Sequence, residues 1–260
     1  MHLDVTELGA FYGSPLGQAA TRALRRPLKG LWSDVRGLRI AGIGYPQPYL
    51  LPFRQDAERV FCLMPAAQGC HRWPQNGPQC VALVEEDRLP LPDASIDRLL
   101  VVHALETSEM VRPLLREIWR VLTDHGRVAV IVPSRVSLWA RLERTPFGHG
   151  HPFTRGQIAR LLGDCLFRPV SFAHGLHMPP FAIRAFVASS GAWEEAGRRL
   201  WPQFAGVHIV EATKELYAGA PAAKRRLRLA PVGAVARPVR ARTAETPLLL
   251  RASSRSGFPE

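Results

Sequence analysis

The chain has 260 residues and a net charge of +12, with 47% hydrophobic and 22% charged residues. These values are typical of a soluble globular protein with one large domain, and no apolar run of about 18 residues is present to span a bilayer. Because the first seven residues are polar and acidic, no secretory signal is expected. The composition therefore predicts a cytoplasmic protein without a membrane span.

The N-terminal segment, residues 1–37, is predicted to be helical. Ser14 followed by Pro15 is typical of a helix start, and small and apolar residues then recur at helical spacing as far as Leu24. A leading helix of this kind in an α/β enzyme often lies over the ligand, which makes Tyr12 a candidate for contact with a substrate. A helix that only packs against the core is the alternative interpretation.

Residues 38–46 predict a buried strand that runs into a glycine turn. An apolar run ends with Gly42 and Gly44, and Pro46 then stops the strand. Glycines at this place let the backbone approach a nucleotide-type ligand closely, although a plain strand-to-helix turn uses them too.

The rest of the chain predicts an α/β architecture. Because the valine, isoleucine and leucine runs are nearly continuous, they indicate strands that are buried on both faces of a mostly parallel, Rossmann-like sheet. Helices on both sides of the sheet would complete a three-layer sandwich. The further strands are predicted at 59–65, 79–84, 96–103, 127–133, 168–173 and 206–214. The further helices are predicted at 109–122, at 154–165 with a capping box of Thr154 and Gln157, and at about 181–200.

Composition divides the chain into a helical segment 1–37, a domain 38–217 and a basic tail 218–260. Between Lys224 and Arg255 there are nine basic residues and one acid, so the tail could contact an acidic partner protein, an anionic membrane or nucleic acid. A solvated extension is the alternative. No aromatic residue accompanies these arginines before Phe258, which disfavours binding to single-stranded nucleic acid.

The four cysteines do not predict a metal site. Cys62, Cys70, Cys80 and Cys165 form no CxxC pair and have no histidine at zinc-ligand spacing. In a chain of this size they do not indicate a disulfide framework either.

Three stretches resemble the class I S-adenosylmethionine-dependent methyltransferases, in particular the methyltransferase type 11 family. They are the glycine turn at 42–44, the acid-Leu-Pro-x-x-Asp segment at 85–97, and the stretch at 115–127, which is similar to the family's helix, glycine turn and start of the fifth strand. The resemblance implies a seven-stranded sheet whose last strand is antiparallel. It also implies S-adenosylmethionine bound across the carboxyl ends of the first strands.

Carried over by position, the resemblance implies a set of cofactor-binding residues. They are Ala41, Gly42, Ile43, Gly44 and Tyr45 under the methionine part, Met64 and Pro65 at the end of the second strand, Glu85 and Glu86 at the adenine, and His103 beside the sulfonium. The sequence departs from the family where Ile40 replaces an acid and Pro46 replaces a third glycine. The acid that takes the ribose hydroxyls is also missing, and Gln47 or Gln68 is a candidate to replace it.

The leading hypothesis is a methyltransferase that acts on a small molecule or a side chain. Methyl transfer needs alignment and the exclusion of water, and it needs a base only when the acceptor is a poor nucleophile. His103, His149 and His151 are the candidate catalytic residues, and the last two, with Tyr12, are candidates for substrate contact. Structural histidines with satisfied hydrogen bonds are the alternative.

Three other functions are weighed against this hypothesis. The missing acids and the basic tail would suit a degenerate methyltransferase fold that serves as a binding or assembly module. A nicotinamide dehydrogenase is disfavoured because the GxGxxG spacing is absent. A nucleic-acid methyltransferase is disfavoured because residues 102–105 are not an Asn/Asp-Pro-Pro-aromatic motif.

Overall fold

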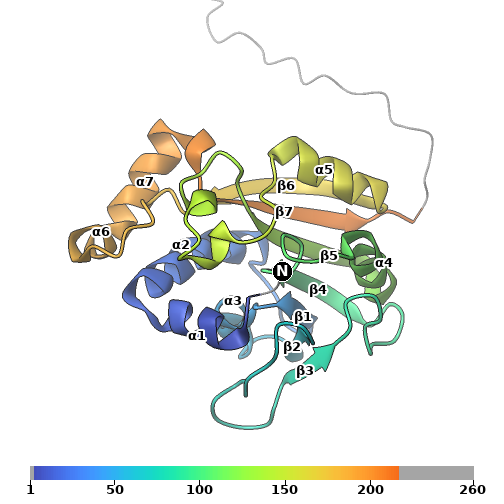
Figure 1. The fold of residues 1–260 in the computed structure, drawn as a ribbon. Coiled ribbons are helices and arrows are strands. Elements are labelled where there is room, and N and C mark those ends of the chain that lie inside the picture. Colours follow the sequence, from blue (N-terminus) through green and yellow to red (C-terminus); the bar gives the residue numbers. More distant parts are fainter. Residues whose placement is uncertain (1–2, 217–260) are drawn as a thin grey trace, which may run out of the picture. The chain divides into compact units, whose positions relative to one another are not determined.

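The computed structural model describes residues 3–216, so the predicted basic tail lies outside the described residues. The described chain forms a seven-stranded sheet in the order β3-β2-β1-β4-β5-β7-β6 (Figure 1). The strands from β3 to β5 pair in parallel, and β7 is antiparallel to both of its neighbours. This arrangement confirms the predicted Rossmann-like fold.

The strands are β1 (Arg39–Gly44), β2 (Arg59–Pro65), β3 (Val81–Val84), β4 (Ile96–Val102), β5 (Leu122–Pro133), β6 (Phe167–Gly175) and β7 (Val207–Lys214). The α-helices are α1 (Val5–Gly13), α2 (Pro15–Leu31), α3 (Gln47–Leu50), α4 (Val111–Val121), α5 (Arg155–Asp164), α6 (Arg184–Ala188) and α7 (Ser190–Leu200). Within residues 3–216, no helix combines the length and apolar character needed to cross a bilayer.

Two predicted helix starts are confirmed, and two predicted boundaries are wrong. The Ser14 side chain caps α2, and Thr154 with Gln157 forms the capping box of α5. The fifth strand begins at Leu122 instead of residue 127, because Leu122 already pairs with Ile96 of β4. The single helix predicted at 181–200 is two helices, α6 and α7, which are separated at Ser189.

Alternate residues of the central strands serve two different cores. Leu100 packs in one core with residues of α1, α2 and α3, whereas its neighbour Val101 packs in the other core with residues of α4 and α5. Figure 1 shows α1 to α3 and α4 with α5 on opposite sides of the sheet. Strands buried on both faces are therefore the reason why the sequence shows apolar runs instead of alternation.

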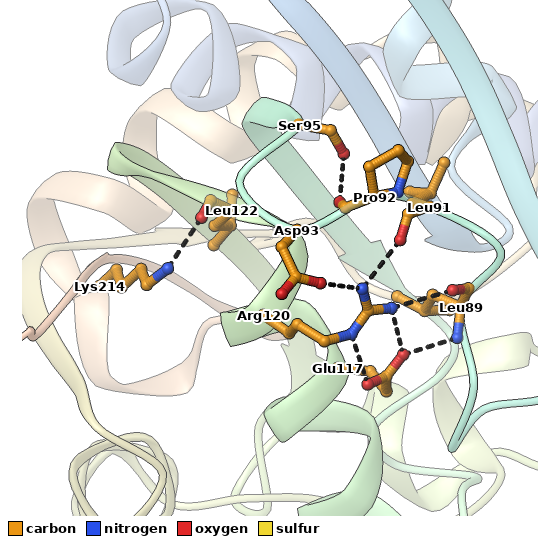
Figure 2. A network of polar contacts seen from close by, with 9 residues as sticks. All are labelled: Leu89, Leu91, Pro92, Asp93, Ser95, Glu117, Arg120, Leu122 and Lys214. Atoms are coloured by element: carbon orange, nitrogen blue, oxygen red, sulfur yellow. Dashed lines mark hydrogen bonds and ion pairs between the residues drawn. The ribbon is translucent and has the colours of Figure 1, made fainter.

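Arg120 of α4 holds the acid-rich segment that leads into β4 (Figure 2). Its guanidinium donates to the carbonyl oxygens of Leu89 and Leu91 at 3.0 and 2.9 Å, and to carboxylate oxygens of Asp93 and Glu117 at 2.6 and 2.7 Å. The hydrogen bond from Arg120 in turn lowers the pKa of Glu117. This network fixes the segment between β3 and the start of β4.

We expect Arg120→Ala to lower the free energy of unfolding by about 2 kcal/mol, because two partly buried carbonyls and Glu117 lose a charged donor. Urea denaturation measures the effect. Arg116→Ala is the matched control on the exposed face of the same helix, and it should change stability by less than about 0.5 kcal/mol. Equal losses in the two variants would contradict the structural role given to Arg120.

His208 of β7 should make the fold sensitive to acid. Burial, with smaller contributions from the neighbouring His174 and Arg155, lowers the pKa of His208 to about 4. The folded pKa thus lies below the ordinary value of 6.5, so the stabilising contribution is complete above pH 6.5 and is lost as the pH falls towards 4. The melting temperature of His208→Phe should fall less over this pH range than that of the wild type, whereas exposed His125→Phe should follow the wild type.

Candidate functional site

The glycine turn at the end of β1 is held by two hydrogen bonds to other segments of the chain. Gly44 has φ +86°, and its carbonyl oxygen accepts a hydrogen bond from Gln68 Nε2 at 3.1 Å. The next residue, Tyr45, donates its backbone N–H to Val102 O of β4 at 2.8 Å. The turn therefore joins the carboxyl ends of β1 and β4 and the loop that follows β2.

His103 follows β4 directly and has a strained backbone. Its φ is +54°, which is uncommon for a residue other than glycine and often marks a functional position. The side chain is buried, and Nδ1 lies 3.1 Å from Glu106 Oε1. Because a carboxylate only accepts hydrogen bonds, this contact places a hydrogen on Nδ1, and in the neutral ring Nε2 then carries the lone pair.

The Nε2 atom of His103 contacts the hydroxyl of Tyr12, which comes from α1. The two atoms are 2.7 Å apart, and the same hydroxyl lies 2.9 Å from the Tyr49 hydroxyl. The lone pair on Nε2 requires Tyr12 to donate, so Tyr12 accepts from Tyr49. Burial is the main reason why the pKa of Tyr12 is raised well above 10. The result is a buried chain of hydrogen bonds through Glu106, His103, Tyr12 and Tyr49.

Helix α1 lies across the carboxyl edge of the sheet. At its start, Val5 N–H donates to Gln68 O at 2.9 Å. Further along, the Tyr12 ring stacks on Tyr45 with a centroid distance of 5.2 Å, and Phe11 meets Phe147 edge to face. The helix thus contacts the segments that follow β2, β1 and β5, as well as His103 after β4.

The residues present fit the cofactor that the resemblance implies, apart from the position of α1. Gln47 Oε1 is buried and has no hydrogen-bond partner within residues 3–216, and the Nε2 atom of the same side chain lies 2.9 Å from Met64 Sδ at the end of β2. This amide oxygen can accept a hydrogen bond at the end of β2, where the acid that takes the ribose hydroxyls in the resembled family is missing. After β3, Glu85 is exposed, and Glu86 accepts a hydrogen bond from Ser108.

The remaining candidates for cofactor contact have their side chains in the protein interior. Ala41 and Ile43 pack in the core beneath α4 and α5, so only their backbone atoms face the edge of the turn. Pro65 is buried at the end of β2. Gln68, the other candidate for the missing acid, is already used as a donor to the glycine turn.

The structure does not bring the rings of His149 and His151 to His103. The Nε2 atom of His149 contacts the Glu143 carbonyl oxygen, and the His151 side chain is exposed. Their loop is nevertheless attached below the site, because the backbone N–H of His151 donates to Glu106 O at 2.7 Å. No hydrogen bond or ring contact joins either side chain to His103 in the part of the chain that the structure describes.

A cavity of about 810 Å³ lies on the outer side of α1. Apolar side chains of Phe11, Phe181 and Ile183 line it, together with the charged Glu7 and Arg144. Tyr12, which contacts His103, follows Phe11 in α1, so successive residues of this helix contact His103 and the cavity.

Sequence reasoning missed Glu106, Tyr49 and Phe147. Glu106 follows His103 by three residues, but the segment after β4 has no periodicity that would place the two side chains together. Tyr49 lies in the short helix α3, for which the sequence analysis gives no prediction. Phe147, whose ring centroid lies 4.9 Å from that of His103, comes from a loop more than 40 residues away.

Comparisons with known proteins agree with this fold. The methyltransferase domain family matches residues 41–130. No curated protein matches the sequence.

Three solved structures illustrate the range of similar proteins. A methyltransferase from Thermotoga maritima, described as a possible histamine N-methyltransferase, has 16% identity, a TM-score of 0.56, and coverage of 81% of this chain and 96% of its own. The [4+2]-cyclase SpnF has 18% identity, a TM-score of 0.52, and coverage of 77% and 83%. The geranyl diphosphate C-methyltransferase from Streptomyces coelicolor, solved with S-adenosylhomocysteine, has 13% identity, a TM-score of 0.51, and coverage of 74% and 75%.

At these identities the likeness concerns the fold alone, and a cyclase among the similar structures shows that this fold does not fix the reaction. The match to residues 41–130 and the sheet order are independent observations that agree. The methyltransferase domain model thus matches residues 41–130, and the described chain has the fold of the S-adenosylmethionine-dependent methyltransferases that it resembles.

Proposed function

We propose that this protein transfers a methyl group from S-adenosylmethionine to a small molecule at the carboxyl end of β4. The observation that carries the proposal is the buried pair of His103 and Glu106, which leaves the lone pair of Nε2 available to accept a proton. A base fixed by a carboxylate suits an acceptor that must lose a proton to become a nucleophile.

The chain's own residues have distinct roles in this proposal. The backbone of the glycine turn, Gly42 to Tyr45, would hold the methionine part of the cofactor, Glu85 and Glu86 would accept from the adenine amine, and Gln47 Oε1 would accept from a ribose hydroxyl. When bound, the cofactor supplies an electrophilic methyl group. His103 would hold the proton taken from the acceptor, and Glu106 would stabilise the imidazolium. His149 and His151 stay candidates for substrate contact only, since neither ring contacts His103.

Binding requires α1 to leave the edge of the sheet, because the helix contacts the segments that follow β1 and β2, where the cofactor would lie. The cavity of about 810 Å³ beside α1 has the size and the apolar lining that a small-molecule acceptor needs. Movement of α1 would connect this cavity with His103.

Calorimetric titration of the full chain with S-adenosylhomocysteine tests the cofactor assignment. We expect micromolar binding to the wild type and about tenfold weaker binding to Gln47→Leu, because the variant loses one buried acceptor. Gln55→Leu is the matched control on an exposed position and should bind like the wild type. Absence of heat and of a thermal shift for the wild type at millimolar ligand would reject the proposed function.

The second candidate function is a binding or assembly module without catalysis. Two observations favour it: α1 fills the cofactor edge, and Met64 and Pro65 stand where the ribose acid is absent. Methyl transfer to any acceptor would exclude it. Contact of the tail with an acidic partner or nucleic acid, and a cytoplasmic location, stay predictions.

A further inference from the structure

The side chain of Tyr12 shows how a phenol is bound beside His103. The phenol ring stacks on Tyr45 with planes only 11° apart, and Phe11 and Tyr49 meet its edges. Its hydroxyl contacts His103 Nε2 at 2.7 Å and Tyr49 at 2.9 Å. Only 8% of the residue is exposed. Ring and hydroxyl are therefore both recognised by the surrounding protein.

The directions of the hydrogen bonds select for a neutral hydroxyl group. His103 Nε2 presents a lone pair, so its partner must donate a proton, and Tyr49 donates to the same partner. A carboxylate has no proton to give to Nε2. An ammonium group has no lone pair to accept from Tyr49, and the lone pair of an arylamine is a poor acceptor because it is delocalised into the ring. A hydroxyl both donates and accepts.

From this arrangement we propose that the methyl acceptor is a phenol whose ring and hydroxyl take the place of Tyr12 when α1 withdraws. The inference rests on the proposed methyltransferase function, and it makes the protein an O-methyltransferase. In the resting protein, the phenol side chain of Tyr12 therefore occupies the position proposed for the acceptor.

The reaction balances with the residues already described. The hydroxyl oxygen forms the new bond to the methyl carbon as the carbon–sulfur bond breaks, and that bonding pair stays on sulfur. The hydroxyl proton goes to His103 Nε2 and later to water. Glu106 accepts from Nδ1–H throughout, so the positive charge on the imidazole faces a carboxylate at 3.1 Å.

Binding of 4-methylphenol, the side-chain analogue of tyrosine, tests directly whether the place of the Tyr12 side chain, here called the phenol slot, binds a phenol. In the full-length Tyr12→Ala variant, which opens the space, we expect 4-methylphenol to bind about tenfold more tightly than toluene, because only the phenol can bond to His103 and Tyr49. The preference should vanish in Tyr12→Ala/His103→Leu. Equal binding of toluene and 4-methylphenol to Tyr12→Ala would overturn the inference.

A measurement on the wild type covers the case in which Tyr12→Ala does not fold. Millimolar 4-methylphenol should compete with the Tyr12 side chain and so speed the amide hydrogen exchange of residues 5–13, whereas toluene should have less effect. Unchanged exchange with 4-methylphenol would count against the slot.

Transfer of labelled methyl groups by the wild type separates this inference from the proposed function. With S-adenosylmethionine present, we expect methylation of 4-methylphenol and not of the matched amine, 4-methylaniline. Methylation of the amine alone would overturn the inference and leave the methyltransferase function standing. Failure of the wild type to bind S-adenosylhomocysteine would instead reject the proposed function, and binding of 4-methylphenol by Tyr12→Ala would still support the phenol slot.

Discussion

Gly44→Ala should destabilise the protein by about 3 kcal/mol or more. The residue has φ +86°, where a side chain costs about 1–2 kcal/mol. A Cβ atom built on it would lie 2.0 Å from Val102 O. The same carbonyl accepts from Tyr45 N–H, so the clash would disturb the contact between β1 and β4. Urea denaturation of wild type and variant measures the loss.

Gly163→Ala is the matched control for this substitution. Gly163 lies within α5, and a Cβ there would meet no heavy atom within 4 Å. The alanine should therefore leave the stability unchanged or raise it by about 0.5–1 kcal/mol through its higher helix propensity. A loss of less than about 1 kcal/mol in Gly44→Ala would show that the turn adjusts easily, contrary to the tight approach seen here.

Tyr12→Phe should open α1 and tighten the binding of S-adenosylhomocysteine. The substitution keeps the ring on Tyr45 and removes the hydroxyl that bonds to His103 and Tyr49. Two lost hydrogen bonds weaken the closed state by about 1–3 kcal/mol, which raises the open population about 5- to 150-fold. The apparent Kd should fall by the same factor, as long as the open state stays the minor one. Calorimetry measures the Kd, and hydrogen exchange of residues 5–13 measures the opening.

Tyr45→Phe is the matched control for the opening of α1. It removes a hydroxyl at the same edge and keeps the stacked ring, so both the Kd and the exchange of α1 should change much less than in Tyr12→Phe. Faster exchange in Tyr12→Phe without tighter binding would mean that α1 does not compete with the cofactor. Slower exchange would contradict the closed state itself.

Site residues at strand ends could be predicted from the sequence, whereas site residues whose contacts come from irregular segments were missed. Gly42, Gly44 and His103 lie at strand ends, and parallel strands bring their carboxyl ends to one edge, so their sequence positions predict their neighbourhood. Tyr12 was a candidate because a leading helix often covers that edge. Glu106 and Phe147 lie in irregular segments, where no period fixes the direction of a side chain. His149 and His151 were candidates for the same edge, but loop geometry turned one to the Glu143 carbonyl and exposed the other.

The layers of the fold could be predicted from the sequence, because buried strands and amphipathic helices show their burial in local patterns of apolar residues. The glycine turn and the acid-rich segment before β4, which together carry the family resemblance, are also visible in the sequence. The position of α1 at the edge of the sheet, and the chain of hydrogen bonds through Tyr12, His103 and Glu106, are known from the three-dimensional structure alone. These contacts join residues up to 91 positions apart, and their directions depend on packing that no local pattern records.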